Sequence, residues 1–258
     1  MAQKRRVAAL IAAAAGIVVL FSPALAAAAT ATTTTGATST GAKAATALYT
    51  SAITAAGKQT SVHYVAKSSE SGKSLTITAS SSATAGTQKI VLYTGKKASG
   101  HLSGRLVDKV AYFKGDTFGL EEYLGMPATL APKYSGKWIY FSSATKSYAP
   151  IAASFGLSAA VGQISMKGPY KQGTSRVNGK AATTLTGANT ASGKKGKPGS
   201  ATLAVAAQGT PLPIRFLGKS LVSKKLVTDT VNYGRWGLKV SPKAPKGAVP
   251  ASSITSSS

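Results

Sequence analysis

The sequence predicts an α+β fold in which a strongly curved antiparallel sheet, a half-barrel, carries helices over its concave face. Three features predict it. A stretch with helical periodicity opens the folded part, short runs with a two-residue period follow, and two further helical stretches interrupt those runs midway. Short connections between consecutive strands favour an antiparallel meander. Because a sheet of many strands twists and curls, we expect the helices to lie in its concavity.

The first predicted helix consists of small residues that recur at three- and four-residue steps and end at Gly57. The residues in this pattern are Ala44, Ala47, Leu48, Ser51, Ala52 and Ala55. A second, short helix should present Phe118, Leu120, Tyr123 and Leu124 on one face and end at Gly125. A third helical stretch covers residues 148–164, broken near Gly156 and restarted at a Ser158 cap.

The predicted strands are short β-branched or aromatic runs between turns rich in Gly, Ser and Lys. Before the helical interruption they cover residues 62–65, 75–78, 90–93 and 106–113. One strand over residues 138–141 lies between the two helical stretches, and after them the strands cover residues 182–185, 202–206, 212–217, 226–231 and 238–240.

The chain divides into one domain and three flanking segments. Lys4, Arg5 and Arg6, an apolar run over 7–21 and an Ala24-Leu25-Ala26 site are typical of a secretory signal over residues 1–26. An uncleaved anchor is the alternative, although the apolar run is short for a bilayer span. Residues 27–41 are expected to be an Ala/Thr-rich linker, 42–249 the folded domain and 250–258 a disordered tail.

The chain is very basic and contains no cysteine. Without the three basic residues of the signal, 28 of the 31 Lys and Arg residues remain against 6 acidic ones, a net charge of +22. Such a charge attracts polyanions, which outside a cell include anionic membrane surfaces and wall polymers rather than nucleic acid. The alternative is that dispersed lysines only keep the protein soluble. The absence of cysteine excludes disulfides, thiolate metal sites and a lipid-modified cysteine.

Little in the sequence favours an enzyme. The two histidines, His63 and His101, lie in a strand and beside a glycine, and Glu121 and Glu122 are adjacent, so they point to different sides of a helix. Asp108 and Asp229 are expected inside strands, paired with Lys or Arg. The motifs HExxH and GxSxG and the P-loop are absent. We therefore expect no catalytic residue, metal or cofactor. We also expect the protein to be a monomer.

Several motifs occur in an order that resembles a known family. They are residues 110–115 (VAYFKG), residues 134–139 (YSGKWI), Val177-Asn178-Gly179 with Leu185 after it, residues 211–215 (PLPIR) and Trp236-Gly237. In this order the chain, over roughly residues 42–246, is similar to actinobacterial lipoproteins of the LppX and LprG type, relatives of the periplasmic lipoprotein carrier LolA. The resemblance implies a curved half-barrel, helices over its mouth and an apolar cavity for acylated lipids. Members commonly carry a lipobox cysteine, which residues 24–29 lack, so a diffusing or electrostatically wall-bound form is expected.

The walls of such a cavity follow from the alternation of the strands. The candidate ligand-binding residues are Leu75, Ile77, Ile90, Leu92, Leu106, Val110 and Tyr112 from the sheet, faced by Leu120, Leu124, Ile151 and Phe155 from the helices. A one-residue error in register would exchange the two faces.

The sequence thus predicts a secreted cell-envelope protein, loosely associated with the wall or membrane surface at most, that carries an acylated lipid or glycolipid between its sheet and its helices. The alternative is a basic module that binds the cell wall or another anionic polymer and has no lipid cavity.

The cleavage site gives a first testable expectation. The mature protein should begin near Ala27 and be found in culture fluid or loosely on the wall, because a cleaved signal leaves no apolar anchor. Intact-mass measurement of the natively expressed protein checks this. A mass that retains residues 1–26 would instead indicate an anchored protein.

Overall fold

The computed structural model describes residues 38–145, 147–190, 199–222 and 225–254 of the 258-residue chain. The predicted signal, residues 27–37 of the predicted linker and residues 255–258 of the predicted tail lie outside the described residues.

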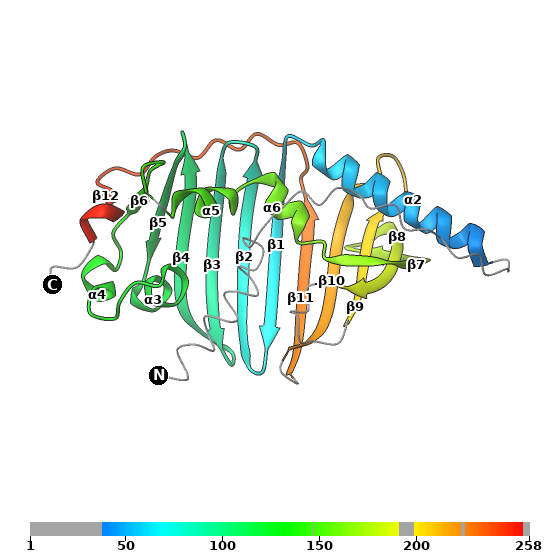
Figure 1. Ribbon diagram of the computed structural model, residues 1–258, viewed down its shortest axis with the longest axis horizontal. Coiled ribbons are helices and arrows are strands. Elements are labelled where there is room, and N and C mark those ends of the chain that lie inside the picture. Colours follow the sequence, from blue (N-terminus) through cyan, green and yellow to red (C-terminus); the bar gives the residue numbers. More distant parts are fainter. Residues whose placement is uncertain (1–37, 146, 191–198, 223–224, 255–258) are drawn as a thin grey trace.

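A single twelve-stranded sheet dominates the described part of the chain (Figure 1). Its order is β12-β6-β5-β4-β3-β2-β1-β11-β10-β9-β8-β7, so it is open at both edges. Neighbouring strands are antiparallel except for the β12–β6 pair, which is parallel. The strands are β1 Ser61–Glu70, β2 Lys73–Ser82, β3 Gly86–Thr94, β4 Lys97–Val107, β5 Val110–Gly115, β6 Ile139–Phe141, β7 Met166–Val177, β8 Lys180–Asn189, β9 Gly199–Ala206, β10 Pro213–Val222, β11 Lys225–Gly234 and β12 Val249–Pro250.

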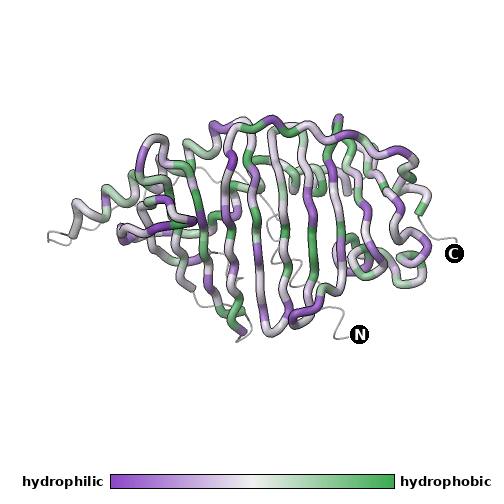
Figure 2. The backbone as a smooth tube through the Cα atoms, turned by 180° about the vertical axis from the view of Figure 1, so that it is seen from behind, coloured by the Kyte–Doolittle hydropathy of each residue, from purple (hydrophilic) through white to green (hydrophobic). Residues whose placement is uncertain are grey.

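The helices gather on one face of this curved sheet, as predicted (Figure 1). They are α2 Thr38–Gly57, α3 Thr117–Leu124, α4 Ala131–Tyr134, α5 Tyr148–Ala153, α6 Leu157–Gly162 and the 3-10 helix η2 Ala251–Ile254. Helix α2 contacts strands β7 and β10 and helix α6. Helix α3 contacts β4 and β5, and α5 contacts β5. Helix α6 contacts β1 and β2. The opposite face is seen from behind in Figure 2, where hydrophilic positions recur over the central strands. The α+β class and the curved antiparallel sheet are therefore confirmed.

Two predicted boundaries at the ends of the domain are wrong. Helix α2 begins at Thr38, so residues 38–41 of the predicted linker are helical. The predicted tail is ordered over 250–254, because Val249 donates a backbone hydrogen bond to the carbonyl of Trp138 at 2.9 Å and β12 pairs with β6. The C-terminal segment thus returns to the edge of the sheet.

Three predicted elements also need correction. The segment 238–240 is not a strand, because its chain is tied to Ser61, whose carbonyl accepts from the Gly237 N–H at 3.0 Å and whose hydroxyl donates to the Leu238 carbonyl. Helix α6 begins after Gly156, which has an extended backbone, rather than at Ser158. The run 106–113 is not one strand but two, β4 and β5.

The turn between β4 and β5 explains this last error. Asp108 and Lys109 have φ angles of 48° and 60°, the left-handed values that a two-residue hairpin turn requires. Asn-Gly or Asp-Gly pairs usually signal such a turn, and an Asp-Lys pair does not. The hydrophobic residues on both sides therefore resembled one continuous strand.

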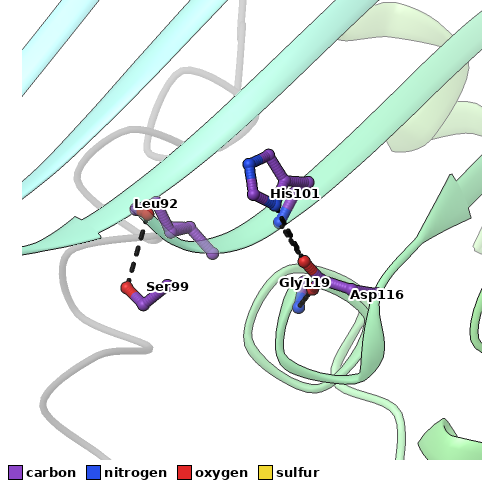
Figure 3. A network of polar contacts seen from close by, with 5 residues as sticks. All are labelled: Leu92, Ser99, His101, Asp116 and Gly119. Atoms are coloured by element: carbon purple, nitrogen blue, oxygen red, sulfur yellow. Dashed lines mark hydrogen bonds and ion pairs between the residues drawn. The ribbon is translucent and has the colours of Figure 1, made fainter. Parts of the chain in front are cut away.

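Asp116 fastens α3 to the sheet (Figure 3). One carboxylate oxygen accepts the Gly119 N–H at 2.7 Å and so caps the helix, and the other accepts the backbone N–H of His101 on β4 at 2.9 Å. The Nδ1 atom of His101 also lies 3.0 Å from this second oxygen. Helix α3 has little room to shift, because a Cβ added at Gly119 would lie 2.3 Å from the carbonyl oxygen of His101.

Replacing Asp116 tests this attachment. D116A removes the cap and the link to β4, so it should lower the free energy of unfolding by about 1–2 kcal/mol. D116N keeps one capping oxygen but loses an acceptor for His101, so its stability should fall between those of D116A and the wild type. Urea denaturation of the three proteins measures the difference. Equal stability of all three would contradict the assigned role.

Candidate functional site

The concave face of the sheet is built from rows of residues that the strand pairing places side by side. The central row runs from β8 to β4 and is apolar throughout, and every member is buried: Leu185, Leu203, Phe216, Val231, Ala66, Ile77, Ile90 and Leu102. Antiparallel partners project to the same side of the sheet, so this row forms a continuous apolar floor beneath the helices.

Most of the predicted cavity residues lie on this floor or in the helices above it. The side chains that are buried within one hydrophobic cluster are Leu75, Ile77, Ile90, Leu92, Leu106, Leu120 and Phe155. Leu124 and Ile151 are partly buried and pack against the same cluster. The structure therefore brings nine of the eleven predicted residues together between the sheet and its helices.

The placement of Val110 and Tyr112 was wrong. Tyr112 pairs with Arg105 and Tyr140, and Val110 pairs with Val107, so both lie on the convex face. The two-residue turn is the reason: it places Leu106 opposite Ala111, which moves the inward set of β5 by one residue from the predicted one. The residues of β5 that face the helices are Ala111, Phe113 and Gly115.

Phe155, at the junction between α5 and α6, packs on the concave side of β3, β4 and β5. Its ring lies over Gly104, where an added Cβ would be 2.8 Å from the Phe155 Cζ atom. At Gly86 an added Cβ would be 2.8 Å from the Phe155 carbonyl oxygen. The ring also lies 5.6 Å from that of Phe113, centroid to centroid. Two glycines on adjacent strands thus form the seat for one aromatic ring, a feature that the sequence analysis missed.

Polar contacts fix the same junction. The Gln88 side-chain amide donates to the Ser154 carbonyl at 2.7 Å, Gly156 forms a β-bridge with Ser82, and the Tyr233 hydroxyl donates to the Ala160 carbonyl at 3.0 Å. In contrast, none of the residues of α5 is buried. The helical segment above the sheet is therefore held firmly at residues 154–160 by contacts with the strands, and only weakly along α5.

A groove opens beside α5, where the ends of the β2–β3 and β4–β5 hairpins approach the segment after β11. Its volume is about 760 Å³, within the range of small-molecule sites. Leu106 lines this groove and also belongs to the buried hydrophobic cluster between the sheet and its helices. The apolar lining consists of Ala83, Ala85, Leu106, Val107, Tyr148, Ala152, Ala153, Val240 and Pro242, and the polar lining includes Thr84, Asp108, Lys109, Ser158 and Ser241. The groove is thus an apolar recess with polar groups among its lining residues.

A second groove of about 720 Å³ lies between the start of α2 and β7. Its lining residues are Gly41, Ala42, Ala44 and residues 169–174, none of which is a predicted cavity residue, whereas the groove beside α5 contains Leu106. We therefore regard the groove beside α5 as the better candidate.

Few ionisable groups face the apolar concave side of the sheet. Asp229 lies opposite Ser68 on the concave side, and burial raises the pKa of its carboxyl, although a hydrogen bond with Ser68 opposes the shift. The expected pairing of Asp229 with Lys or Arg is thus replaced by one with Ser68, and Asp108 lies exposed in a turn rather than inside a strand. Burial also raises the pKa of Tyr64 to about 12, so its phenol is neutral at physiological pH. The concave side therefore favours uncharged groups.

The histidines are engaged in structural contacts. His101 contacts the Asp116 carboxylate through Nδ1. The nearby Ser99 hydroxyl does not contact this imidazole but donates a hydrogen bond to the Leu92 carbonyl at 3.3 Å (Figure 3). His63 Nδ1 lies 3.1 Å from the Ser80 hydroxyl, and burial lowers its pKa. Within the described ranges, no three His, Asp or Glu residues are grouped as metal ligands. None of the described helices is long and apolar enough to cross a membrane.

Comparison with known proteins identifies the fold. No protein-family model matches the chain, and no curated protein is significantly similar to it in sequence. Among solved structures, it is similar to LprF from Mycobacterium bovis, with a TM-score of 0.53 and 16% identity over 80% of this chain and 98% of LprF. The Mycobacterium tuberculosis lipoprotein LppX gives a TM-score of 0.48 and 14% identity over 77% of this chain and 98% of LppX. The predicted resemblance is therefore confirmed at the level of the fold.

The seat of Phe155 can be tested by adding one methyl group. G104A should lower the free energy of unfolding by about 1–3 kcal/mol, because the new Cβ would overlap the rings of Phe155 and Phe113. G234A is a matched control, because this strand glycine has open space at its Cβ position. Urea denaturation midpoints of both variants check the difference. Similar stabilities would show that the ring does not depend on Gly104.

Proposed function

We propose that the protein is a secreted cell-envelope lipid-binding protein, with no enzymatic activity, that holds acyl chains of a lipid or glycolipid between its sheet and its helices. The single observation that carries the proposal is the groove beside α5, because its lining residue Leu106 also belongs to the buried hydrophobic cluster between the sheet and its helices. The family resemblance of the sequence, which implies an apolar cavity for acylated lipids, supports it.

Burial of methylene groups is the source of affinity. Each CH₂ group that leaves water contributes about 0.8 kcal/mol, so an acyl chain needs no specific polar contact to bind tightly. The polar lining residues Thr84, Lys109 and Ser241 offer hydrogen bonds and charge to a head group that stays near solvent. The proposal thus assigns the chain to the apolar walls and the head group to the polar lining.

Helix α5 is the part of the helical segment above the sheet that moves to admit the chain. It is six residues long, contains Pro150 and contributes no buried residue, whereas the α5–α6 junction is anchored by Phe155 and Ser154. Short elements with few buried contacts open at low free-energy cost. We assign the entrance to the gap between α5 and Leu106.

The alternative is a basic module that binds an anionic wall polymer and holds no lipid. It is supported by the net charge of +25 for the whole chain. Charge-based attachment weakens as salt shortens the screening length, from about 10 Å at 0.1 M to about 3 Å at 1 M, whereas apolar burial does not. Retention of bound lipid in 1 M salt therefore distinguishes the lipid-binding protein from the wall-binding module.

Organic extraction of the natively purified protein tests the proposal. The extract should contain an acylated lipid in stoichiometric amount, identified by mass spectrometry, and the amount should not fall when the protein is first washed in 1 M salt. A protein that carries no lipid, or releases it in salt, would support the wall-binding alternative.

A variant that fills the groove sharpens this test. A153W places a large ring in the groove and should weaken the affinity for lipid by about tenfold or more, which corresponds to about 1.4 kcal/mol of binding free energy, so that less lipid is retained after dilution. A149W is the matched control, because Ala149 is exposed on the same helix and does not line the groove. If the two variants retain equal amounts of lipid, the groove is not the entrance.

A further inference from the structure

Exposed lysines form a line across the convex face of the sheet. Lys114 lies on β5, Lys89 on β3, Lys67 on β1 and Lys219 on β10, and all four side chains are exposed. Since the sheet order here is β5-β4-β3-β2-β1-β11-β10, they occupy every second strand. We call these four residues the lysine line. Strand alternation places these residues on the side of the sheet away from the helices, which is the side seen in Figure 2.

Hydroxyl groups alternate with these lysines on the strands between them. Ser103 pairs with both Lys114 and Lys89, Thr76 is opposite Lys67, and Thr228 is opposite Lys219. Neighbouring strands are about 4.8 Å apart, so consecutive lysines are about 10–12 Å apart at the backbone. The surface therefore presents ammonium groups at regular intervals with hydrogen-bond donors between them.

No carboxylate side chain interrupts the lysine line. The chain has six acidic residues, and the structure describes all of them. They lie on the concave side (Glu70, Asp229), in the β4–β5 turn (Asp108), or within or next to α3 (Asp116, Glu121, Glu122). The two neighbouring arginines are already bound: Arg215 to Asn232 at 2.8 Å, and Arg105 to the Lys243 carbonyl at 2.9 Å. The positive charge of the lysines is thus not neutralised within the protein.

We propose that the lysine line is a binding site for a flexible, phosphate-bearing polymer of the cell envelope. Separated charges with hydroxyl donors between them suit a chain that presents anionic oxygens at intervals. A convex surface touches a flat bilayer only along a strip, whereas a flexible chain can follow its curvature.

This inference deepens the expectation, drawn from the net charge, of an anionic surface or wall-polymer partner, and it does not depend on the lipid site. The two sites lie on opposite faces of one sheet. One side would hold the protein to a polymer while the other holds its lipid. Loss of either activity alone is therefore possible and can be observed.

Binding to linear inorganic polyphosphate, measured by titration at several salt concentrations, tests the site. K67Q/K89Q/K114Q/K219Q should weaken binding at least about tenfold at 0.1 M salt. The slope of log K against log salt should fall by about 3, because each contacted charge on a flexible polyanion contributes about 0.7. The matched control is K58Q/K96Q/K180Q/K246Q, which removes four exposed lysines outside the line and the same net charge. It should keep most of the affinity and of the slope.

Three results would overturn the inference: equal losses in the two variants, an unchanged line variant, or a line variant that loses binding to phosphatidylglycerol vesicles but not to polyphosphate. The last would assign the face to a membrane. Circular dichroism and the amount of co-purified lipid should be unchanged in the line variant, which excludes misfolding as the cause. A wild-type protein that binds polyphosphate through the line but carries no lipid would contradict the lipid proposal and leave this one standing.

Discussion

The packing of Phe155 on Gly86 and Gly104 is the contact on which the rest of the site depends. An open sheet of twelve strands has an apolar concave face that must be covered, and the described helices over its centre are short. A single ring against two glycines, together with the Gln88–Ser154 hydrogen bond, holds their junction on the sheet. Helix α5 next to that junction buries none of its residues. The α5–α6 junction is thus fixed on the sheet, whereas α5 beside it is held by fewer contacts.

Strand alternation gives the two faces of the sheet different chemistry. The inward row through Ile77 and Ile90 is apolar and buried, whereas the outward positions next to it carry Thr76, Thr78 and Lys89. Since side chains alternate between faces, neither set can change register without placing lysine in the core. Register is therefore strongly specified, and the same alternation produces an apolar compartment on one side and a basic surface on the other.

The sequence was sufficient to predict the fold class and most of the floor, because residue periodicity reports burial directly. Leu75, Ile90 and Phe155 followed from it. The placement of Val110 and Tyr112 did not follow, because the turn at Asp108 and Lys109 uses left-handed backbone angles without a glycine. This turn shifts the inward-facing positions of β5 by one residue. The glycine seat and the lysine line depend on contacts between strands distant in sequence, which periodicity within one strand does not contain. The order of motifs was sufficient for the resemblance that the LprF comparison confirms for the fold.

Photocrosslinking with a fatty acid that carries a diazirine at the end of its chain tests the central claim most directly. If acyl chains lie between the sheet and its helices, adducts should form on peptides that contain Leu106, Ala152 and Phe155, and an excess of unlabelled lipid should suppress them. Adducts confined to the convex face around Lys67 and Lys89, or labelling that unlabelled lipid does not reduce, would contradict the account.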